Sequence, residues 1–186
     1  MTRRVSTRGE KVRVLAGTGV AAALSVGGVA FAHAAGFWIN TTDSMPMGLW
    51  RQAPPHTVRR GDVVLLCLPA TPVTQLGRTR GYIGSGPCPT GQETLLKPVA
   101  AAAGDDVDVT AAGISVNGAE IPNSGQLARD GAGRPLPAYP AGSYHVPGGE
   151  LWLVSQHNPK SFDSRYFGPV PTSLVRSIVR PVWVAE

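Results

Sequence analysis

The chain has 186 residues and a formal net charge of +5, and most of that charge comes from the first 13 residues, where five basic residues stand against one acidic residue. The length fits a single domain with a hydrophobic core, and 23 glycines with 17 prolines are typical of a turn-rich β protein. The remaining chain has 12 basic and 11 acidic residues, which excludes a nucleic-acid-binding domain, because such a domain carries its basic charge on its folded surface.

The basic tail, residues 1–13, is followed by a segment without Asp, Glu, Lys or Arg at residues 14–39. About 20 apolar residues cross a bilayer as a helix, and basic residues before such a segment keep the N-terminus in the cytoplasm. We therefore expect a single-pass anchor in the bacterial inner membrane, in contact with lipid, and a periplasmic domain at residues 40–186. Small residues in "AFAHA" leave a cleavable secretory signal as the alternative, which exports the same domain.

The expected domain begins with "NTTDSMPMGLW", residues 40–50, in which three hydroxyl side chains precede Met-Pro-Met-Gly. Hydroxyl residues are common in loops. A serine is also a nucleophile when a base lies beside it. This loop alone leaves both interpretations of Ser44 open.

The next element, "RRGDVVLLCLP" at residues 59–69, is typical of a turn followed by a buried strand. Glycines and prolines interrupt residues 69–92, which predicts a surface loop. Cys67 and Cys88 are 21 residues apart, and two thiols of an exported domain form a disulfide in an oxidising compartment. The alternative for Cys67 is a buried, reduced side chain within its strand.

A second apolar strand is expected at residues 93–101, "ETLLKPVAA", with Lys97 in its middle. If this strand is buried, loss of hydration lowers the pKa of the lysine amine. A neutral lysine accepts a proton from a serine hydroxyl, which is the chemistry of a Ser-Lys dyad. The alternative is an edge position from which Lys97 extends its amine into solvent.

The rest of the chain predicts short strands. Residues 104–122 predict two strands with a hairpin turn at Asn117-Gly118, and residues 150–156 alternate as a strand does. Residues 173–184 predict an edge strand, because Pro181 lacks a backbone donor. No segment after residue 40 shows a helical apolar stripe, so we expect an all-β domain, a distorted barrel or sandwich. Loops are expected at 123–149 and 157–171.

The loop sequence "SFDSR", residues 161–165, crowds hydroxyl and charged side chains together. A structural interpretation is that Asp163 and Arg165 form an ion pair that holds the shape of the loop. Phosphate-binding and dinucleotide-binding glycine motifs are absent from the sequence, as is a G-x-S-x-G nucleophile motif. The histidines lack metal-ligand spacing, so no metal or cofactor is expected; they are His33, His56, His145 and His157.

Taken together, "TTDSMPMGL", "RRGDVVLL", "LLKPVAAAAGDDV" and "SFDSRYFGPVP" resemble, in order, the conserved boxes of type I signal peptidases, which are Ser-Lys serine peptidases. The resemblance covers residues 38–184. It is nearest to the TraF branch, which serves conjugative plasmid transfer, through "NTTDSMPMGLW", "RGYIGSGPCP" and "LLKPVAA". Pro98 stands where ordinary signal peptidases have Arg, and "VSQHNPKS" replaces their Gly-Asp-Asn, which also favours that branch.

The resemblance implies a membrane-anchored serine endopeptidase with the signal-peptidase fold. Ser44 would be the nucleophile and Lys97 the general base. The Ser44 backbone N–H and the Thr42 hydroxyl would stabilise the oxyanion.

The resemblance also assigns roles to the last box. Ser161 would hydrogen-bond the lysine. Asp163 would be required, in an electrostatic and structural role through Arg165. Because a neighbouring carboxylate raises a lysine pKa, we expect Asp163 not to contact the Lys97 amine.

Three functions follow as expectations. The first is maturation of a conjugative pilin or other transfer-system precursor, with or without cyclisation, alongside type IV secretion components. The second is general signal peptidase activity. The third, from a different class, is a non-catalytic, membrane-tethered β domain of an envelope secretion complex.

Overall fold

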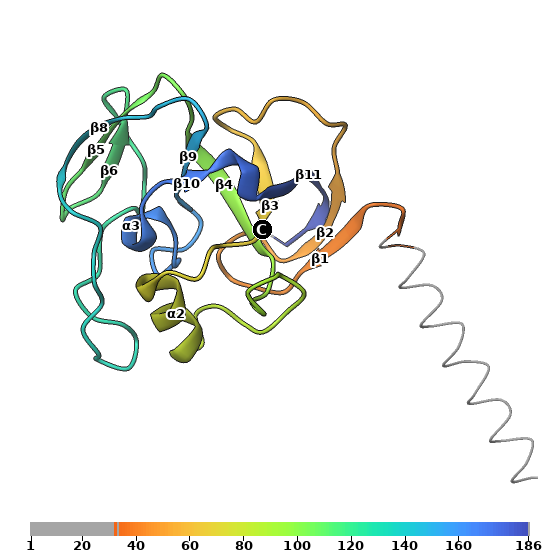
Figure 1. Ribbon diagram of the computed structural model, residues 1–186, viewed down its shortest axis with the longest axis horizontal. Coiled ribbons are helices and arrows are strands. Elements are labelled where there is room, and N and C mark those ends of the chain that lie inside the picture. Colours follow the sequence, from red (N-terminus) through yellow and green to blue (C-terminus); the bar gives the residue numbers. More distant parts are fainter. Residues whose placement is uncertain (1–31, 33, 186) are drawn as a thin grey trace, which may run out of the picture. The chain divides into compact units, whose positions relative to one another are not determined.

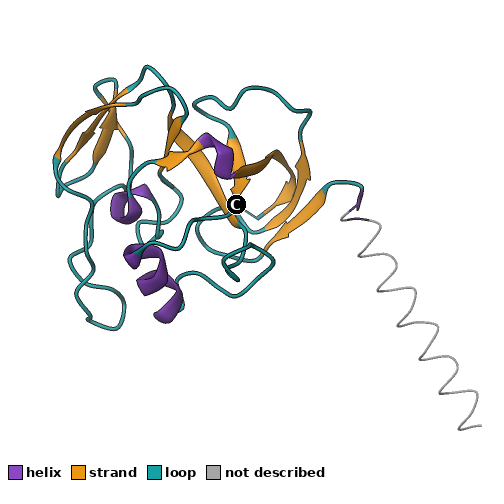
Figure 2. Ribbon diagram, in the orientation of Figure 1, coloured by secondary structure: helices purple, strands orange, loops and turns teal. Residues whose placement is uncertain are grey.

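The computed structural model describes residue 32 and residues 34–185, and they form mainly β structure, as expected (Figures 1 and 2). One compact unit covers residues 39–186. The strands are β1 (Phe37–Asn40), β2 (Gly48–Gln52), β3 (Val63–Leu66), β4 (Leu95–Ala101), β5 (Asp106–Val109), β6 (Ile114–Val116), β7 (Ala119–Glu120), β8 (Gly142–His145), β9 (Glu150–Leu153), β10 (Val170–Pro171) and β11 (Val175–Val184). The helices are α2 (Pro72–Thr79), α3 (Ser164–Phe167) and the 3₁₀ turn η1 (Thr172–Leu174).

A curled seven-stranded sheet, in the order β1-β2-β11-β3-β4-β9-β10, forms the larger part of the domain (Figure 1). The two apolar runs expected as strands are β3 and β4, which pair antiparallel with Val64 opposite Lys97. Continuous apolar runs fit strands that are covered on both faces. Side chains of this sheet, among them Leu66, Val99 and Leu153, form the main core with Phe162.

Strand β11 corrects the expectation of an edge strand, because it lies between β2 and β3. Its pairing is divided along its length: residues 175–179 pair with β3, and residues 179–184 pair with β2. Pro181 pairs with Trp50 of β2 beyond the point where the β3 pairing stops. The proline is therefore tolerated in an interior strand, because that part of the strand has a partner on one side only.

The segment 69–92 was expected to be a loop but contains helix α2. Thr71 caps the helix and forms a capping box with Thr74, and Pro72 occupies the first turn, where its missing N–H costs nothing. Gly77 of α2 packs so closely on Phe162 that an added Cβ would lie 2.7 Å from the ring. Helix α2 has only eight residues, about two turns, which is too short to show a sustained apolar stripe, and this explains why the sequence pattern missed it.

The disulfide expected from the sequence is present and joins Cys67 to Cys88. Cys67 directly follows strand β3, and Cys88 lies in the excursion that contains α2. The bond therefore fastens the far end of this excursion to the main sheet.

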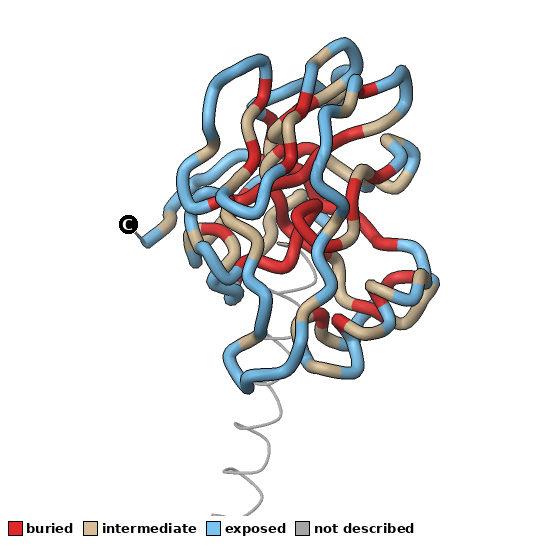
Figure 3. The backbone as a smooth tube through the Cα atoms, turned by 90° about the vertical axis from the view of Figure 1, so that its left-hand side faces the viewer, coloured by how far each residue is buried: buried red, intermediate tan, exposed pale blue. Residues whose placement is uncertain are grey.

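A smaller sheet, in the order β7-β6-β5-β8, occupies residues 106–145. Three of its strands lie in the region where two were expected, and the predicted turn is present with positive φ at Asn117 (52°) and Gly118 (78°). Its core contains Val107, Ile114 and Trp152. Figure 3 shows the buried stretches of the chain gathered inside the domain and the exposed stretches around them.

Most of the anchor expected at residues 14–39 lies outside the described residues, which include residue 32 and residues 34–39 of it. Its last residues are an exception and a correction, since Phe37–Asn40 form strand β1 and not the end of a helix. Among the described residues, no helix has the length and apolar character needed to cross a membrane.

Candidate active site

The loop that carries Ser44 is held by Asn40, a residue whose importance the sequence analysis missed. Asn40 is buried, and its side-chain amide donates to the carbonyls of Thr42, Met45 and Pro46 at 3.0, 2.9 and 3.1 Å. Its carbonyl oxygen accepts from the Thr42 backbone N–H at 3.2 Å. One side chain thus satisfies backbone groups on both sides of Ser44, which is half-buried.

Lys97 lies in strand β4 with only 2% of its surface exposed, so the alternative of a solvent-exposed amine is wrong. Its Nζ donates a hydrogen bond to Ser161 Oγ at 2.9 Å. Loss of hydration is the main cause that lowers the pKa of Lys97 from 10.5 to about 8. The charge of Asp163 opposes this shift in pKa and the charge of Arg165 adds to it.

Asp163 and Arg165 form an ion pair with both side chains fully buried. The Arg165 Nε and Nη2 atoms donate to Oδ1 and Oδ2 of Asp163, each at 2.8 Å. The same carboxylate accepts from the backbone N–H groups of Arg165 (3.2 Å) and Ser155 (3.0 Å). Four donors fill the acceptor sites of a carboxylate, and Lys97 is not among them.

Arg165 also gathers backbone carbonyls around itself. Its Nη1 donates to Asn123 and Pro159 at 2.8 and 3.0 Å, and its Nη2 donates to Ser161 at 3.1 Å. The guanidinium therefore holds the loop that presents the Ser161 hydroxyl to Lys97. A buried charge with this many partners stays ionised, and loss of hydration is offset by Asp163, which raises the pKa of Arg165.

A second residue that the sequence analysis missed is Ser155, which lies two residues after the end of strand β9. Its backbone N–H donates to Asp163, and its hydroxyl donates to the backbone carbonyl of Ser44. In the sequence, "VSQHNPKS" stands out only as a departure from the family pattern, and its first serine is the signal that points to Ser155. Through these contacts one hydrogen-bonded network reaches from Lys97, by way of Ser161, Arg165 and Asp163, to the Ser44 backbone.

Two expected contacts of the site are not made in this structure. No hydrogen bond joins Ser44 Oγ to Lys97 Nζ in the described part of the chain. The Thr42 hydroxyl donates instead to Asn40 Oδ1 at 2.8 Å, so its one proton is already engaged. Catalytic contacts are often long before substrate binds.

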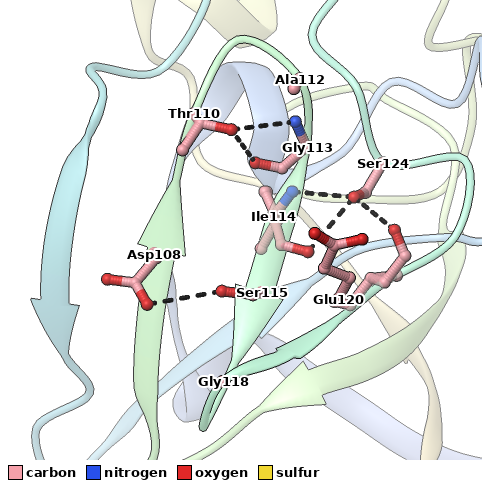
Figure 4. A pocket seen from close by; sticks show the side chains of 10 residues that line it. Asp108, Thr110, Ala112, Gly113, Ile114, Ser115, Gly118, Glu120 and Ser124 are labelled. Carbon is pink, nitrogen blue, oxygen red and sulfur yellow. Dashed lines mark hydrogen bonds between the residues drawn. The ribbon is translucent and has the colours of Figure 1, made fainter.

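Elsewhere the described residues hold no cluster of three or more potential metal ligands. His56 and His145 each lie beside a single carboxylate, Asp62 and Asp106 respectively, at 3.0 and 2.8 Å. A cavity of about 260 Å³ lies in the smaller sheet and shares no lining residue with the network around Lys97 (Figure 4). Ser124 in its wall has its hydroxyl bonded to backbone, accepting from Ile114 N–H at 2.8 Å and donating to the Ile121 carbonyl at 2.6 Å.

Comparison with known proteins places this geometry in context. Residues 12–184 match the family described as signal peptidase, peptidase S26. A plasmid transfer protein TraF of Escherichia coli is 42% identical over 165 residues, covering 88% of this chain and 91% of that protein. A probable conjugal transfer protein TraF of Sinorhizobium fredii is 40% identical over 163 residues, covering 85% and 82%.

Among solved structures, a signal peptidase I of Enterococcus faecalis aligns with 66% of this chain and 97% of its own, at 17% identity and a TM-score of 0.36. The sequence matches, which extend over nearly the whole chain, carry the assignment of family.

Proposed function

We propose, since the chain belongs to the signal peptidase family, peptidase S26, that it is a membrane-anchored serine endopeptidase in which Ser44 and Lys97 cleave leader peptides from precursor proteins. Its precursors would be those of a conjugative transfer system, with pilin as the first candidate.

The observation that carries the proposal is the burial of Lys97 in strand β4, where its amine is held by the Ser161 hydroxyl at 2.9 Å. With a pKa of about 8, roughly a tenth of its amine is neutral at pH 7. A catalytic base needs a pKa near the working pH, because it must be unprotonated and still attract a proton. An ordinary surface lysine, with a pKa near 10.4, is neutral less than about a thousandth of the time.

The proposed reaction uses residues of this chain alone. Ser44 Oγ attacks the scissile carbonyl while Lys97 Nζ takes its proton, and the new C–O bond replaces the C–N bond when the amine leaves with that proton. Lys97 then activates water to release the acyl group. The Ser44 N–H stabilises the oxyanion, and Thr42 adds a second donor after its hydroxyl turns away from Asn40.

Strand β4 offers a place for the substrate backbone. Residues 95–98 pair with β3, whereas pairing with β9 begins only at Val99. The second edge of residues 95–98 therefore has no strand beside it among the described residues. An extended peptide that adds to this edge would lie next to Lys97, which follows the known mode of strand addition.

The role in conjugation rests on the relatives, whose printed names are plasmid and conjugal transfer proteins. A TraF-type enzyme would act at the periplasmic face of the inner membrane, where precursors emerge, alongside type IV secretion components. If an amine replaces water in the second step, the product is a cyclic pilin. Mass spectrometry separates these products, since the cyclic form is lighter by one water.

Cleavage of a pilin-type precursor by the purified full chain tests the peptidase proposal. Wild type is expected to cleave, and Ser44→Ala and Lys97→Ala are expected to lose cleavage. Lys160→Ala is the matched control, because Lys160 is an exposed lysine in the loop before Ser161. Equal cleavage by wild type, Ser44→Ala and Lys97→Ala would remove the proposal and favour a non-catalytic envelope subunit.

General signal peptidase activity is the second candidate, favoured by the family match alone. The two roles differ in living cells. If Ser44→Ala abolishes plasmid transfer while bulk protein export continues, the specialised role stands. If export fails instead, the general role replaces it.

A further inference from the structure

We propose that Ser155 is a positioning residue for the nucleophile: its hydroxyl fixes the backbone of Ser44 and so aims the Ser44 side chain at the scissile carbonyl. This inference rests on the proposed peptidase function and adds a residue to it.

Ser155 is fully buried, and each of its polar atoms is engaged. Its N–H donates to Asp163 Oδ2 at 3.0 Å, and its carbonyl accepts from Arg165 Nη2 at 3.4 Å. The hydroxyl accepts from the His157 N–H at 3.2 Å and donates to the Ser44 carbonyl. The backbone of Ser155 is thus fixed by the buried ion pair, and only its hydroxyl reaches the loop that carries Ser44.

The contact joins segments 111 residues apart in sequence. In the described residues, the Ser44 carbonyl accepts no other hydrogen bond. Asn40 holds the carbonyls on either side, those of Thr42 and Met45. Ser155 therefore adds a hydrogen bond to the carbonyl of Ser44 itself. This bond fixes the peptide plane that follows the Ser44 Cα.

A fixed peptide plane matters because a nucleophile must approach its carbonyl within a narrow range of distances and directions. A misplacement of about 1 Å can reduce the rate roughly 100-fold. Without the Ser155 hydroxyl, the Ser44 carbonyl turns toward other donors or water, and the side chain follows the backbone. Substrate would still bind to strand β4, and Lys97 would keep its burial and its contact with Ser161.

The test compares Ser155→Ala with Ser124→Ala. Ser124 is a matched control, because it is 2% exposed and its hydroxyl also accepts from one backbone N–H and donates to a backbone carbonyl (Figure 4). It lies in the wall of the cavity in the smaller sheet and not in the network around Lys97. Both variants lose a buried hydroxyl, so their Tm values should fall by comparable amounts.

For Ser155→Ala we expect kcat to fall about 10- to 100-fold with little change in KM. The pH at which the rate levels off should stay at that of wild type, because the surroundings of Lys97 are unchanged. The Thr42 amide, whose N–H donates to Asn40 Oδ1 in the same loop, should exchange hydrogen about fivefold faster in the resting enzyme, which is the effect of losing one net hydrogen bond. Ser124→Ala should show none of these three changes.

Two results would overturn the inference. One is equal kcat in Ser155→Ala and Ser124→Ala with unchanged exchange at the Thr42 amide. The other is a shifted pH profile in Ser155→Ala, which would assign the hydroxyl to Lys97 instead. A wild type that fails to cleave refutes the peptidase function itself, and the exchange measurement then still decides whether Ser155 orders the loop.

Discussion

The Lys97 amine donates to the Ser161 hydroxyl across 2.9 Å, with both residues 2% exposed. This contact holds the amine at a defined point while leaving its lone pair, once the amine is neutral, free to accept a proton. The contact also shows how the hydrophobic core accommodates an ionisable side chain. The amine has a hydrogen-bond partner, and burial lowers its pKa.

The pH dependence of cleavage follows from that pKa. The neutral amine is the active form, so kcat/KM should rise with pH by about tenfold per unit below 8 and level off above about 8. Rates with a peptide substrate between pH 6 and 10 measure it. A profile that is flat over this range, or that rises until pH 10, would show that an amine with this pKa is not the base.

Replacement of Lys97 by Met should stabilise the protein while removing activity. Burial lowers the pKa of Lys97 to about 8 in the folded state, whereas the unfolded chain keeps 10.5. Below pH 8 the folded protein must bury a cation, and the full cost, up to about 3 kcal/mol, applies there.

As pH rises from 8 to 10.5 the unfolded state binds more protons than the folded state, so wild-type stability increases. In urea unfolding, the free energy of unfolding of Lys97→Met should therefore exceed that of wild type at pH 7, and by a smaller amount at pH 10. A difference in unfolding free energy that does not change with pH would contradict the lowered pKa of Lys97.

Removal of Arg165 should destabilise the fold severely. Arg165→Met leaves the Asp163 carboxylate buried without its cation, and breaking one side of a buried pair costs about 3–5 kcal/mol. Chemical denaturation measures the change. Arg134→Met is the control, since Arg134 pairs with Asp130 from a side chain that is 44% exposed and should cost much less. Equal losses of unfolding free energy in both variants would mean that burial of the Asp163–Arg165 pair does not set its contribution to stability.

Reduction of the disulfide should lower stability through the unfolded state. The two cysteines are 21 residues apart, and cross-linking a loop of this length contributes about 3 kcal/mol. A Cys67→Ala/Cys88→Ala double variant should match the reduced wild type in urea unfolding and should not respond to reductant. If reduction leaves the unfolding midpoint unchanged, the bond does not constrain the unfolded chain.

The sequence patterns predicted local elements well where one strong signal dominated. Continuous apolar runs predicted β3 and β4, and Asn117-Gly118 predicted the turn, because each needs only its own residues. The patterns failed for α2, which is short and stabilised by its caps, and for β11, whose place between β2 and β3 depends on pairing with distant strands.

Residue types and their order were enough to indicate the chemistry available: the family, the nucleophile candidate Ser44, the lysine in an apolar strand, and the Asp-Arg pair. The surroundings of these residues depend on how distant segments pack together. Lys97 is buried because strands and loops far along the chain cover it, and Ser155 reaches Ser44 across 111 residues. Hydration and long-range hydrogen bonds are properties of the packed chain, so residue types in linear order cannot specify them.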